Sequence, residues 1–512
     1  MIADYLVVGA GAAGCALAGR LAAEPGVSVL LVEHGGPARN PLIAVPRAFY
    51  VTLRSKTYTH RYPTRAVAGG DAEVWMRGRG VGGSTLVNGM MWVRGSRADA
   101  DALAAAGNPG WDARAFADAY ASLERRLGVS VPTEGDDVTE ALFSSAASLG
   151  LRRTDDVNAA DDERIGFTPA TIRDGRRVTA AALLRPSGRQ GSLTVLTRAR
   201  VDRVLLDGTR AVGVLVERRG RMIEVRARRE VLVAAGAVES PLLLERSGIG
   251  RPDVLTAAGV TPVVESSNVG ERMIEQRAVS MQVRFRDRRG PTERLNTRPK
   301  QLVEGARYLA TRRGPVATSG YDVVSVFRSS PAVDRPDVQG VWVPMALDET
   351  SARMQLAPYS GMLFTGYAVR PTTPSSVHLG ADAVPVVAPR YLEHEAERAA
   401  TGSILEHARR VVATGPLADL VADEVFPGPT VATPEDVVGY ALRSGGGIYH
   451  AVGSCAMGPA DDDVVDHRLR VRGTDGLRVV DASVLPRQLS GSSAAPVTAV
   501  GWIAGGMVLG DS

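Results

Sequence analysis

The stretch that decides the fold lies at the start of the chain and reads Tyr5-Leu6-Val7-Val8-Gly9-Ala10-Gly11-Ala12-Ala13-Gly14. Its apolar half predicts a strand buried in a parallel sheet, and residues 15–23 continue as a predicted helix. A second buried strand over residues 27–32 ends in Glu33, where a carboxylate can accept hydrogen bonds from ribose hydroxyls. This βαβ unit of about 30 residues is the pattern of a dinucleotide-binding fold.

The motif residues have separate physical roles in binding a dinucleotide. Gly9 permits the tight turn after the strand, Gly11 lets the backbone approach the diphosphate, and Gly14 lets the helix pack closely on the strand. Ala12 and Ala13 lie in the loop just before the predicted helix, whose free N–H groups and positive dipole end point at the phosphates. We therefore expect all of them at the cofactor.

The same glycine spacing recurs at Gly78, Gly80 and Gly83. No apolar strand is predicted before this second copy, and the aspartates that follow, Asp99 and Asp101, lie on an alanine-rich helical segment. A second dinucleotide site is therefore not expected there.

Length and composition limit the class of protein. The 512 residues suggest two or three structural units, and 45% apolar with 23% charged residues is ordinary globular usage. The most apolar stretch, residues 494–510, is interrupted by glycines and a proline, so no membrane span is predicted. The net charge is +4, and the basic runs alternate with acids, which disfavours a nucleic-acid partner.

The two cysteines, Cys15 and Cys455, form neither a CxxC pair nor part of a metal-ligand cluster, so no metal site is predicted. A secretory leader is not expected either, because residues 4–8 already read as a core strand. We therefore expect a cytoplasmic protein.

Downstream, residues 101–150 predict helices, and strands are predicted at 201–206, 211–217, 230–234, 278–285 and 361–369. A long helix is predicted at 393–414, a buried strand at 479–481 and an apolar helix near 497–508. Because pieces of the nucleotide fold alternate with other material, the chain is predicted to be an α/β protein of two interleaved domains.

Four segments resemble the signatures of the glucose–methanol–choline (GMC) oxidoreductases. They are GRGVGGSTLVN at residues 78–88, GAVESPLLLERSGIG at 236–250, YHAVGSCAMG at 449–458 and VVDASVLP at 479–486. The resemblance implies a Rossmann-like FAD-binding domain, assigned to residues 1–100, 190–272 and 445–512. It also implies an α+β substrate-binding (cap) domain, assigned to residues 101–189 and 273–444.

The resemblance further implies that the nucleotide is FAD. It places Asn88 at the flavin, the Val201 backbone at the adenine edge, and Asp481 and Ala482 beside the flavin ring and ribityl chain. Val87 stands where some relatives carry a histidine bonded to the flavin, so FAD is expected to be non-covalent. The residues expected to bind FAD are Gly9, Gly11, Ala12, Ala13, Gly14, Glu33, Arg79, Gly83, Ser84, Asn88, Val201, Asp481 and Ala482.

The chemistry that the resemblance implies is oxidation of a CH–OH group of a small-molecule alcohol. Hydride would pass to flavin N5 while His450 takes the hydroxyl proton, a task that suits a side chain with a pKa near neutrality. The other six histidines are expected to be structural or exposed. Oxygen or another electron acceptor would reoxidise the flavin, and the sequence leaves that choice open.

Ser492 stands where relatives usually carry a histidine or asparagine beside the substrate oxygen. Three readings are open: Ser492 acts directly or through water, another group of the cap replaces it, or the reaction has changed to that of a lyase or decarboxylase. A flavin-binding protein without turnover is a further alternative. Six side chains are considered as pocket candidates: Tyr321, Trp342, Met345, Phe364, Tyr367 and Arg370.

Overall fold

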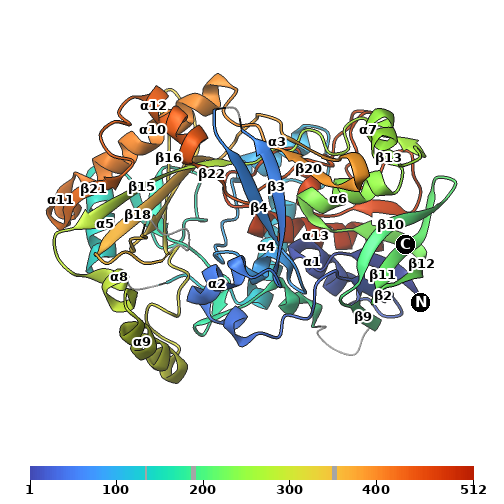
Figure 1. Ribbon diagram of the computed structural model, residues 1–512, viewed down its shortest axis with the longest axis horizontal. Coiled ribbons are helices and arrows are strands. Elements are labelled where there is room, and N and C mark those ends of the chain that lie inside the picture. The colour runs from blue at the N-terminus through green and yellow to red at the C-terminus, as the bar shows by residue number, and fades with distance from the viewer. Residues whose placement is uncertain (68, 133–134, 186–191, 349–354, 512) are drawn as a thin grey trace.

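The computed structural model describes residues 1–67, 69–132, 135–185, 192–348 and 355–511. A seven-stranded sheet lies near both chain ends, in the right half of Figure 1. Its strands, in spatial order, are β10 (Arg200–Asp207), β11 (Arg210–Arg218), β12 (Arg221–Val233), β1 (Ile2–Val8), β2 (Ser28–Val32) and β9 (Ser192–Leu196), with β23 (Leu477–Val479) paired to β12.

The predicted Rossmann-like unit is confirmed. β1 pairs in parallel with both β2 and β12, and α1 (Ala12–Leu21) connects β1 to β2. The helix begins at Ala12 rather than at the predicted Cys15, because Gly11 is its N-cap. α13 (Ala494–Gly510) packs against α1 so closely that a Cβ atom on Gly501 would lie 2.2 Å from the Ala13 carbonyl oxygen.

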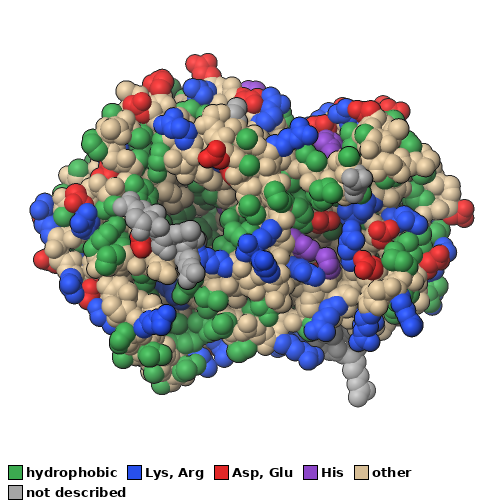
Figure 2. All heavy atoms as spheres, in the orientation of Figure 1, with side chains coloured by type: hydrophobic (Ala, Val, Ile, Leu, Met, Phe, Trp, Pro, Cys, Tyr) green, Lys and Arg blue, Asp and Glu red, His purple; other side chains and the backbone are tan. Residues whose placement is uncertain are grey.

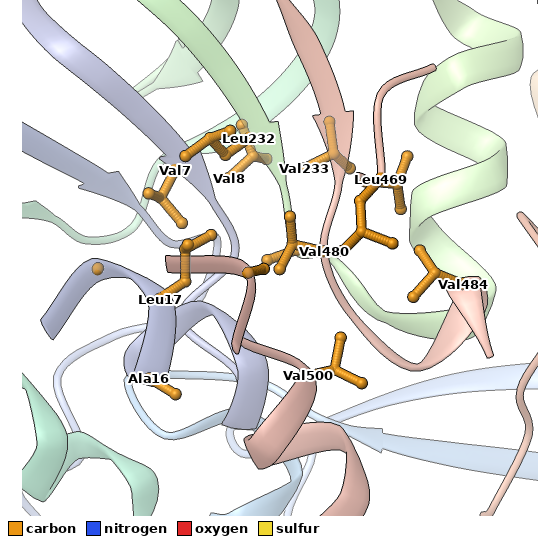
Figure 3. Close-up of a cluster of buried hydrophobic side chains, with 14 of the residues drawn as sticks. Val7, Val8, Ala16, Leu17, Leu232, Val233, Leu469, Val480, Val484 and Val500 are labelled. Atoms are coloured by element: carbon orange, nitrogen blue, oxygen red, sulfur yellow. The ribbon is translucent and has the colours of Figure 1, made fainter. Parts of the chain in front are cut away.

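The two ends of the chain share one core. Figure 3 shows side chains of β1, α1, β12 and α13 together with those of the segments that follow Leu469 and Val480. All the labelled side chains are buried, and burial of apolar surface contributes roughly 25 cal/mol per Å². This shared core places residues 469–500, which include the predicted motif at 479–486, beside the N-terminal βαβ unit.

A second sheet has eight strands, mainly antiparallel, and occupies the left half of Figure 1. Its order is β21 (Val421–Phe426), β15 (Arg277–Phe285), β18 (Gly361–Ala368), β17 (Val338–Val343), β16 (Val323–Phe327), β6 (Arg164–Phe167) and β5 (Arg152–Thr154), with β22 (Gly446–Gly447) paired to β15. We call this sheet the cap sheet.

The two faces of the cap sheet have different neighbours because successive side chains of a strand point to opposite faces. Phe364 and Trp342 pack into the cluster that contains Ile404 of α10 (Glu395–Val412). Tyr367 lies on the opposite face, in a cluster with Val341. The face with Trp342 and Phe364 is therefore covered by α10, and Tyr367 points away from that helix.

A four-stranded sheet joins segments from both predicted domains. Its order is β19 (Ser376–Leu379), β20 (Pro385–Ala388), β3 (Thr59–Ala66) and β4 (Ala72–Gly78). β4 leads into the second glycine motif, although no apolar strand was expected there. It is a half-exposed strand of an antiparallel hairpin, and a short 3₁₀ turn, η3 (Gly83–Leu86), follows it. The domain boundaries stay a prediction.

The remaining elements connect these sheets or cover them. Figure 1 shows α10 and α12 over the upper left of the molecule and α9 at its lower left edge. The helices not yet given are α2 (Phe49–Arg54), α3 (Arg97–Ala105), α4 (Ala113–Leu127), α5 (Asp137–Ser148), α6 (Gly236–Arg246), α7 (Pro252–Ala257), α8 (Gly290–Leu295), α9 (Arg298–Thr311), α11 (Gly415–Leu420) and α12 (Pro434–Ser444). The short pieces are β7 (Ile172–Arg173), β8 (Arg176–Arg177), β13 (Ile249–Gly250), β14 (Val264–Glu265), η1 (Pro41–Ala44), η2 (Pro46–Ala48), η4 (Ala180–Leu184), η5 (Ala381–Ala383) and η6 (Ala482–Val484).

None of the helices in the described part of the chain combines the length and the apolarity that crossing a membrane requires. The apolar sequence of α13 is explained by its packing on α1.

Candidate functional site

The glycine loop between β1 and α1 has the geometry of a phosphate cradle. A Cβ atom on Gly9 would lie 2.4 Å from the Ala234 carbonyl oxygen, and one on Gly14 would lie 1.9 Å from the Gly9 carbonyl oxygen. At Gly11, in contrast, a Cβ atom would meet nothing within 4 Å, and no side chain caps the helix start. The open space above Gly11 and the free N–H groups at Ala12 and beyond suit a diphosphate.

Glu33 ties this loop to the second glycine motif. Its carboxylate accepts from the backbone N–H groups of Ala10 at 2.9 Å, Gly35 at 2.7 Å and Gly80 at 3.0 Å. Each carboxylate oxygen has more than one lone pair. The side chain is thus held in place by the loops and retains acceptor capacity for a ribose hydroxyl.

The segment 78–88 lies directly on the phosphate loop. Gly82 N–H donates to the Ala10 carbonyl at 2.8 Å, and a Cβ atom on Gly83 would lie 2.6 Å from Gly11 Cα. Ser84 is exposed, and its hydroxyl accepts from Gly78 N–H at 3.0 Å. Two glycine motifs that are far apart in the sequence therefore form one surface.

Two buried polar atoms of this segment suit a bound group. Arg79 Nε and Asn88 Oδ1 have no hydrogen-bond partner within the described ranges of the chain. Buried polar groups in proteins are nearly always paired. Asn88 also lines a small pocket with Met91 and Ala494, at the start of α13. The donors and acceptors present therefore fit a large polar cofactor.

The other predicted cofactor residues come from two further segments. Val201 is buried, and the β10–β11 pairing shifts register between Val201 and Arg203. The Asp481 carboxylate is fully engaged, because it accepts from Gly236 N–H at 2.9 Å, from the Ser240 hydroxyl and from Ser483. Asp481 thus anchors α6, and Ala482 next to it presents only its backbone.

His450 is positioned by contacts at its backbone and its ring. Glu275, which is 2% exposed, accepts from His450 N–H at 2.8 Å and from Ala451 N–H at 3.0 Å. Gln488 Nε2 donates to the His450 carbonyl at 2.6 Å. The preceding Tyr449 has a φ of 67°, a left-handed conformation that is uncommon for a bulky residue. Several segments thus combine to fix one imidazole.

The tautomer of His450 follows from its neighbour Gln276. His450 Nδ1 lies 2.7 Å from Gln276 Oε1, and Gln276 Nε2 donates to the Val369 carbonyl at 3.2 Å. Because the amide nitrogen is used there, the oxygen faces the ring and accepts a hydrogen bond from Nδ1–H. His450 Nε2 is therefore left with its lone pair, which is the form that a proton acceptor needs.

The electrostatic environment keeps this imidazole neutral. Burial, reinforced by the positive charge of Arg77, lowers the pKa of His450 to about 3. Burial also raises the pKa of Glu275, whose Oε2 lies 3.5 Å from Arg77 Nη2. The imidazole is therefore neutral at physiological pH, and its pKa lies below the near-neutral value that the sequence led us to expect for the base.

Ser492 is 5% exposed, and among the residues that the structure describes its hydroxyl has no hydrogen-bond partner. The loop that carries it is held by the preceding Ser490, which accepts from Arg370 Nη1 at 2.9 Å and donates to Asp99. Arg335 completes this network with a contact to Asp99 at 2.7 Å. The pocket candidate Arg370 is thus a support for the Ser492 loop.

Sequence reasoning listed Tyr367 only as a pocket candidate, but its ring lies 6.0 Å from the His450 ring, edge to face at 72°. Its hydroxyl accepts from Gln339 Nε2 at 2.5 Å, which leaves the O–H hydrogen to be donated. A Cβ atom on Gly491 would lie 3.4 Å from Gln339 Oε1, so this pair lies between His450 and the Ser492 loop. Trp342 and Phe364 face α10 and do not reach this region.

Glu275, Gln276, Gln339 and Gln488 were not singled out from the sequence. The adjacent polar pair at 275–276, just before a segment predicted as an apolar strand, was the available signal. Within the described ranges, no group of three or more His, Cys, Asp or Glu side chains is arranged to hold a metal ion.

Comparison with known proteins matches two family models, both described as GMC oxidoreductase, to residues 3–279 and 371–501. A GMC-type oxidoreductase of Mycobacterium tuberculosis, itself uncharacterized, is 34% identical over 528 residues, covering 97% of each chain. An oxygen-dependent choline dehydrogenase of Brucella anthropi is 30% identical, covering 100% of this chain and 96% of that one.

Solved structures agree with this assignment. The crystal structure of a pyridoxine 4-oxidase from Mesorbium loti has a TM-score of 0.86 and 29% identity, covering 98% of each chain. That of a formate oxidase has a TM-score of 0.87 at 23% identity, covering 100% of this chain and 98% of that one, and shows the shared fold. The chain is therefore an enzyme of the GMC oxidoreductase family, whose cofactor is FAD.

Proposed function

We propose that this enzyme oxidises a CH–OH group of a small-molecule alcohol, with His450 Nε2 as the acceptor of the hydroxyl proton. The observation that carries the proposal is the contact between His450 Nδ1 and Gln276 Oε1 at 2.7 Å. It leaves Nε2 unprotonated, and the rigid contacts from Glu275 and Gln488 hold the ring in one orientation. A base that is already oriented and neutral needs little reorganisation before proton transfer.

FAD, when bound, supplies the hydride acceptor that such an oxidation needs. Gly11 and the start of α1 would hold its diphosphate, Glu33 its ribose and the Val201 backbone its adenine. Arg79 and Asn88 have buried polar atoms, without partners among the described residues, that a flavin or phosphate can satisfy. We expect the cofactor to be non-covalent because Val87 offers no nucleophile.

The alkoxide that forms as the proton leaves needs a second polar contact besides His450. Two groups are candidates for that role. The buried hydroxyl of Ser492 has no hydrogen-bond partner among the described residues. Tyr367 packs on the His450 ring, and its O–H can still donate a hydrogen bond. We propose that Ser492 and Tyr367 together replace the usual histidine or asparagine, with Gln339 orienting the phenol.

The names of relatives narrow the substrate class. Relatives named for choline and for pyridoxine act on molecules that carry a primary alcohol. We infer a small alcohol of comparable size for this enzyme, and oxygen or another acceptor for reoxidation. A lyase or decarboxylase remains the alternative reaction. The cytoplasmic location stays a prediction.

The test is an anaerobic screen of the FAD-loaded enzyme against primary and secondary alcohols. Oxidation predicts bleaching of the flavin band together with an aldehyde or ketone product. Product formation with the flavin still oxidised would instead indicate a lyase. A broad panel that gives neither bleaching nor product would contradict the proposal. Readmission of oxygen then shows whether oxygen restores the band.

A further inference from the structure

Helix α9 presents an apolar face to solvent. Leu302, Val303 and Leu309 are 75%, 67% and 68% exposed, and Ala306 and Ala310 are exposed beside them. Figure 2 shows hydrophobic side chains gathered at the lower left, where Figure 1 places α9. Single exposed apolar residues are common, but a contiguous exposed apolar face indicates a binding surface.

The helical period shows that this face points directly away from the protein. At 3.6 residues per turn, positions 302, 303, 306, 309 and 310 fall within an arc of about 120°. The buried residues of α9, Glu304 and Tyr308, lie about 180° from the centre of that arc. The helix therefore has two faces, and packing on the protein uses only the one with Glu304 and Tyr308.

Positive charge flanks the apolar face. Arg298, Arg307 and Arg313 lie along its sides or at its end, and no ion-pair partner for them exists among the described residues. The neighbouring acids are already engaged, because Glu304 pairs with Arg294 at 2.7 Å and Glu293 pairs with Lys300. The result is an apolar stripe with cations on both sides.

We propose that α9 docks the enzyme on a lipid bilayer that contains anionic headgroups. An interfacial helix of this kind buries its apolar face about 5–10 Å into the boundary between headgroups and acyl chains, while flanking arginines contact lipid phosphates. Figure 1 shows α9 at the edge of the molecule, so a planar surface can approach it. The proposal is independent of the alcohol chemistry.

Charge complementarity favours a lipid surface over a second copy of the chain. Two copies of this face packed antiparallel would bring Arg298 of one helix toward Arg313 of the other. Like charges at that spacing oppose association, whereas anionic headgroups attract all of them. The experiment must therefore distinguish dimerisation through this face from binding to lipid.

The experiment is flotation of the FAD-loaded full chain with two kinds of vesicle, one of phosphatidylcholine alone and one of equal parts phosphatidylcholine and phosphatidylglycerol. We expect binding to the anionic vesicles, weakened by salt. The double variant Leu302→Gln/Leu309→Gln and the triple variant Arg298→Gln/Arg307→Gln/Arg313→Gln should each lower it by roughly tenfold or more. The matched control is Met222→Gln/Val263→Gln, which removes two apolar side chains that are 52% and 50% exposed elsewhere; its binding should not change.

Flavin absorbance and circular dichroism of each variant confirm that it is folded. Wild-type protein that stays with the buffer in the presence of anionic vesicles would overturn the proposal. Equal binding by the double variant would overturn it as well. Sedimentation velocity tests whether a second copy of the chain covers this face instead. If the wild type is a dimer and Leu302→Gln/Leu309→Gln is a monomer, the face binds a second copy and not lipid.

Discussion

His450 Nδ1 and Gln276 Oε1 lie 2.7 Å apart, although 174 positions separate the two residues in the chain. Gln276 stands at the edge of the cap sheet, just before β15, and His450 belongs to the segment that runs beside Asp481. The contact therefore links two segments that lie far apart in the sequence. It also decides which ring nitrogen can accept a proton.

The first prediction concerns Gln276 as a positioning residue. Gln276→Leu removes the acceptor at Nδ1, so the ring can rotate or change tautomer. Loss of one buried hydrogen bond of about 1–3 kcal/mol corresponds to a flavin reduction rate roughly 5- to 150-fold lower. Anaerobic stopped-flow absorbance measures this rate directly.

Gln282→Leu is the matched control for that variant, because Gln282 is equally buried on β15 but bonds to Leu347 and Tyr359. It should lower thermal stability and leave the reduction rate of the folded, FAD-loaded enzyme unchanged. If Gln276→Leu and Gln282→Leu slow flavin reduction equally, Gln276 contributes to the stability of the fold and does not position His450.

The second prediction concerns the polar partner of the substrate oxygen. Tyr367→Phe and Ser492→Ala each remove one hydroxyl, and removal of a donor to a developing oxyanion typically costs about 10²–10³ in rate. We expect both variants to slow flavin reduction while FAD absorbance is retained. If Ser492→Ala alone is silent, the tyrosine acts without it. Wild-type rates in both variants would refute this part of the proposal.

The third prediction is a flat pH profile. Because burial and Arg77 lower the pKa of His450 to about 3, its neutral form persists well below the ordinary histidine range. The rate constant of flavin reduction should therefore stay constant from about pH 8 down to about pH 5. A decline that titrates near pH 6.5 would show that the imidazole is not shielded as described.

The fourth prediction concerns His378, which was expected to be structural or exposed. Burial lowers its pKa, but hydrogen bonds to Glu245 at 2.7 Å and Glu271 at 3.0 Å outweigh burial and raise it to about 9. Because the folded pKa exceeds the unfolded value, the stabilisation is complete below about pH 6.5 and is lost as the pH rises through about 9. His378→Leu should cost roughly 1–3 kcal/mol at pH 6 and much less at pH 10.

Chemical denaturation of wild type and variant at the two pH values measures this difference. His407 is a useful contrast, because burial lowers its pKa to about 3 and its ring stacks on Phe327 at 3.5 Å. The loss in free energy of unfolding caused by His407→Leu should not become smaller as the pH rises. If His378→Leu lowers the free energy of unfolding by the same amount at both pH values, the His378 ring is neutral in the folded protein.

The sequence alone predicted the elements that depend on local pattern. The strand–glycine–helix order at residues 5–23 depends on backbone constraints within a few positions, and α/β class follows from it. The resemblance placed His450 because its motif is contiguous. Gln276 and Gln339 were not predicted, and Tyr367 was only a pocket candidate, because their contacts join distant segments and leave no local pattern in the sequence. The carboxylates of Glu33 and Asp481 also accept hydrogen bonds from backbone N–H groups of other segments, which their motifs alone do not predict.

The most direct test of the central claim compares His450→Ala with His394→Ala in anaerobic stopped-flow reduction by the best alcohol of the screen. His394 is an exposed histidine at the start of α10 and serves as the control. The account predicts that His450→Ala retains FAD and is reduced roughly 10²–10⁴-fold more slowly, whereas His394→Ala matches wild type. Reduction of His450→Ala at the wild-type rate would contradict the assignment of His450 as the base.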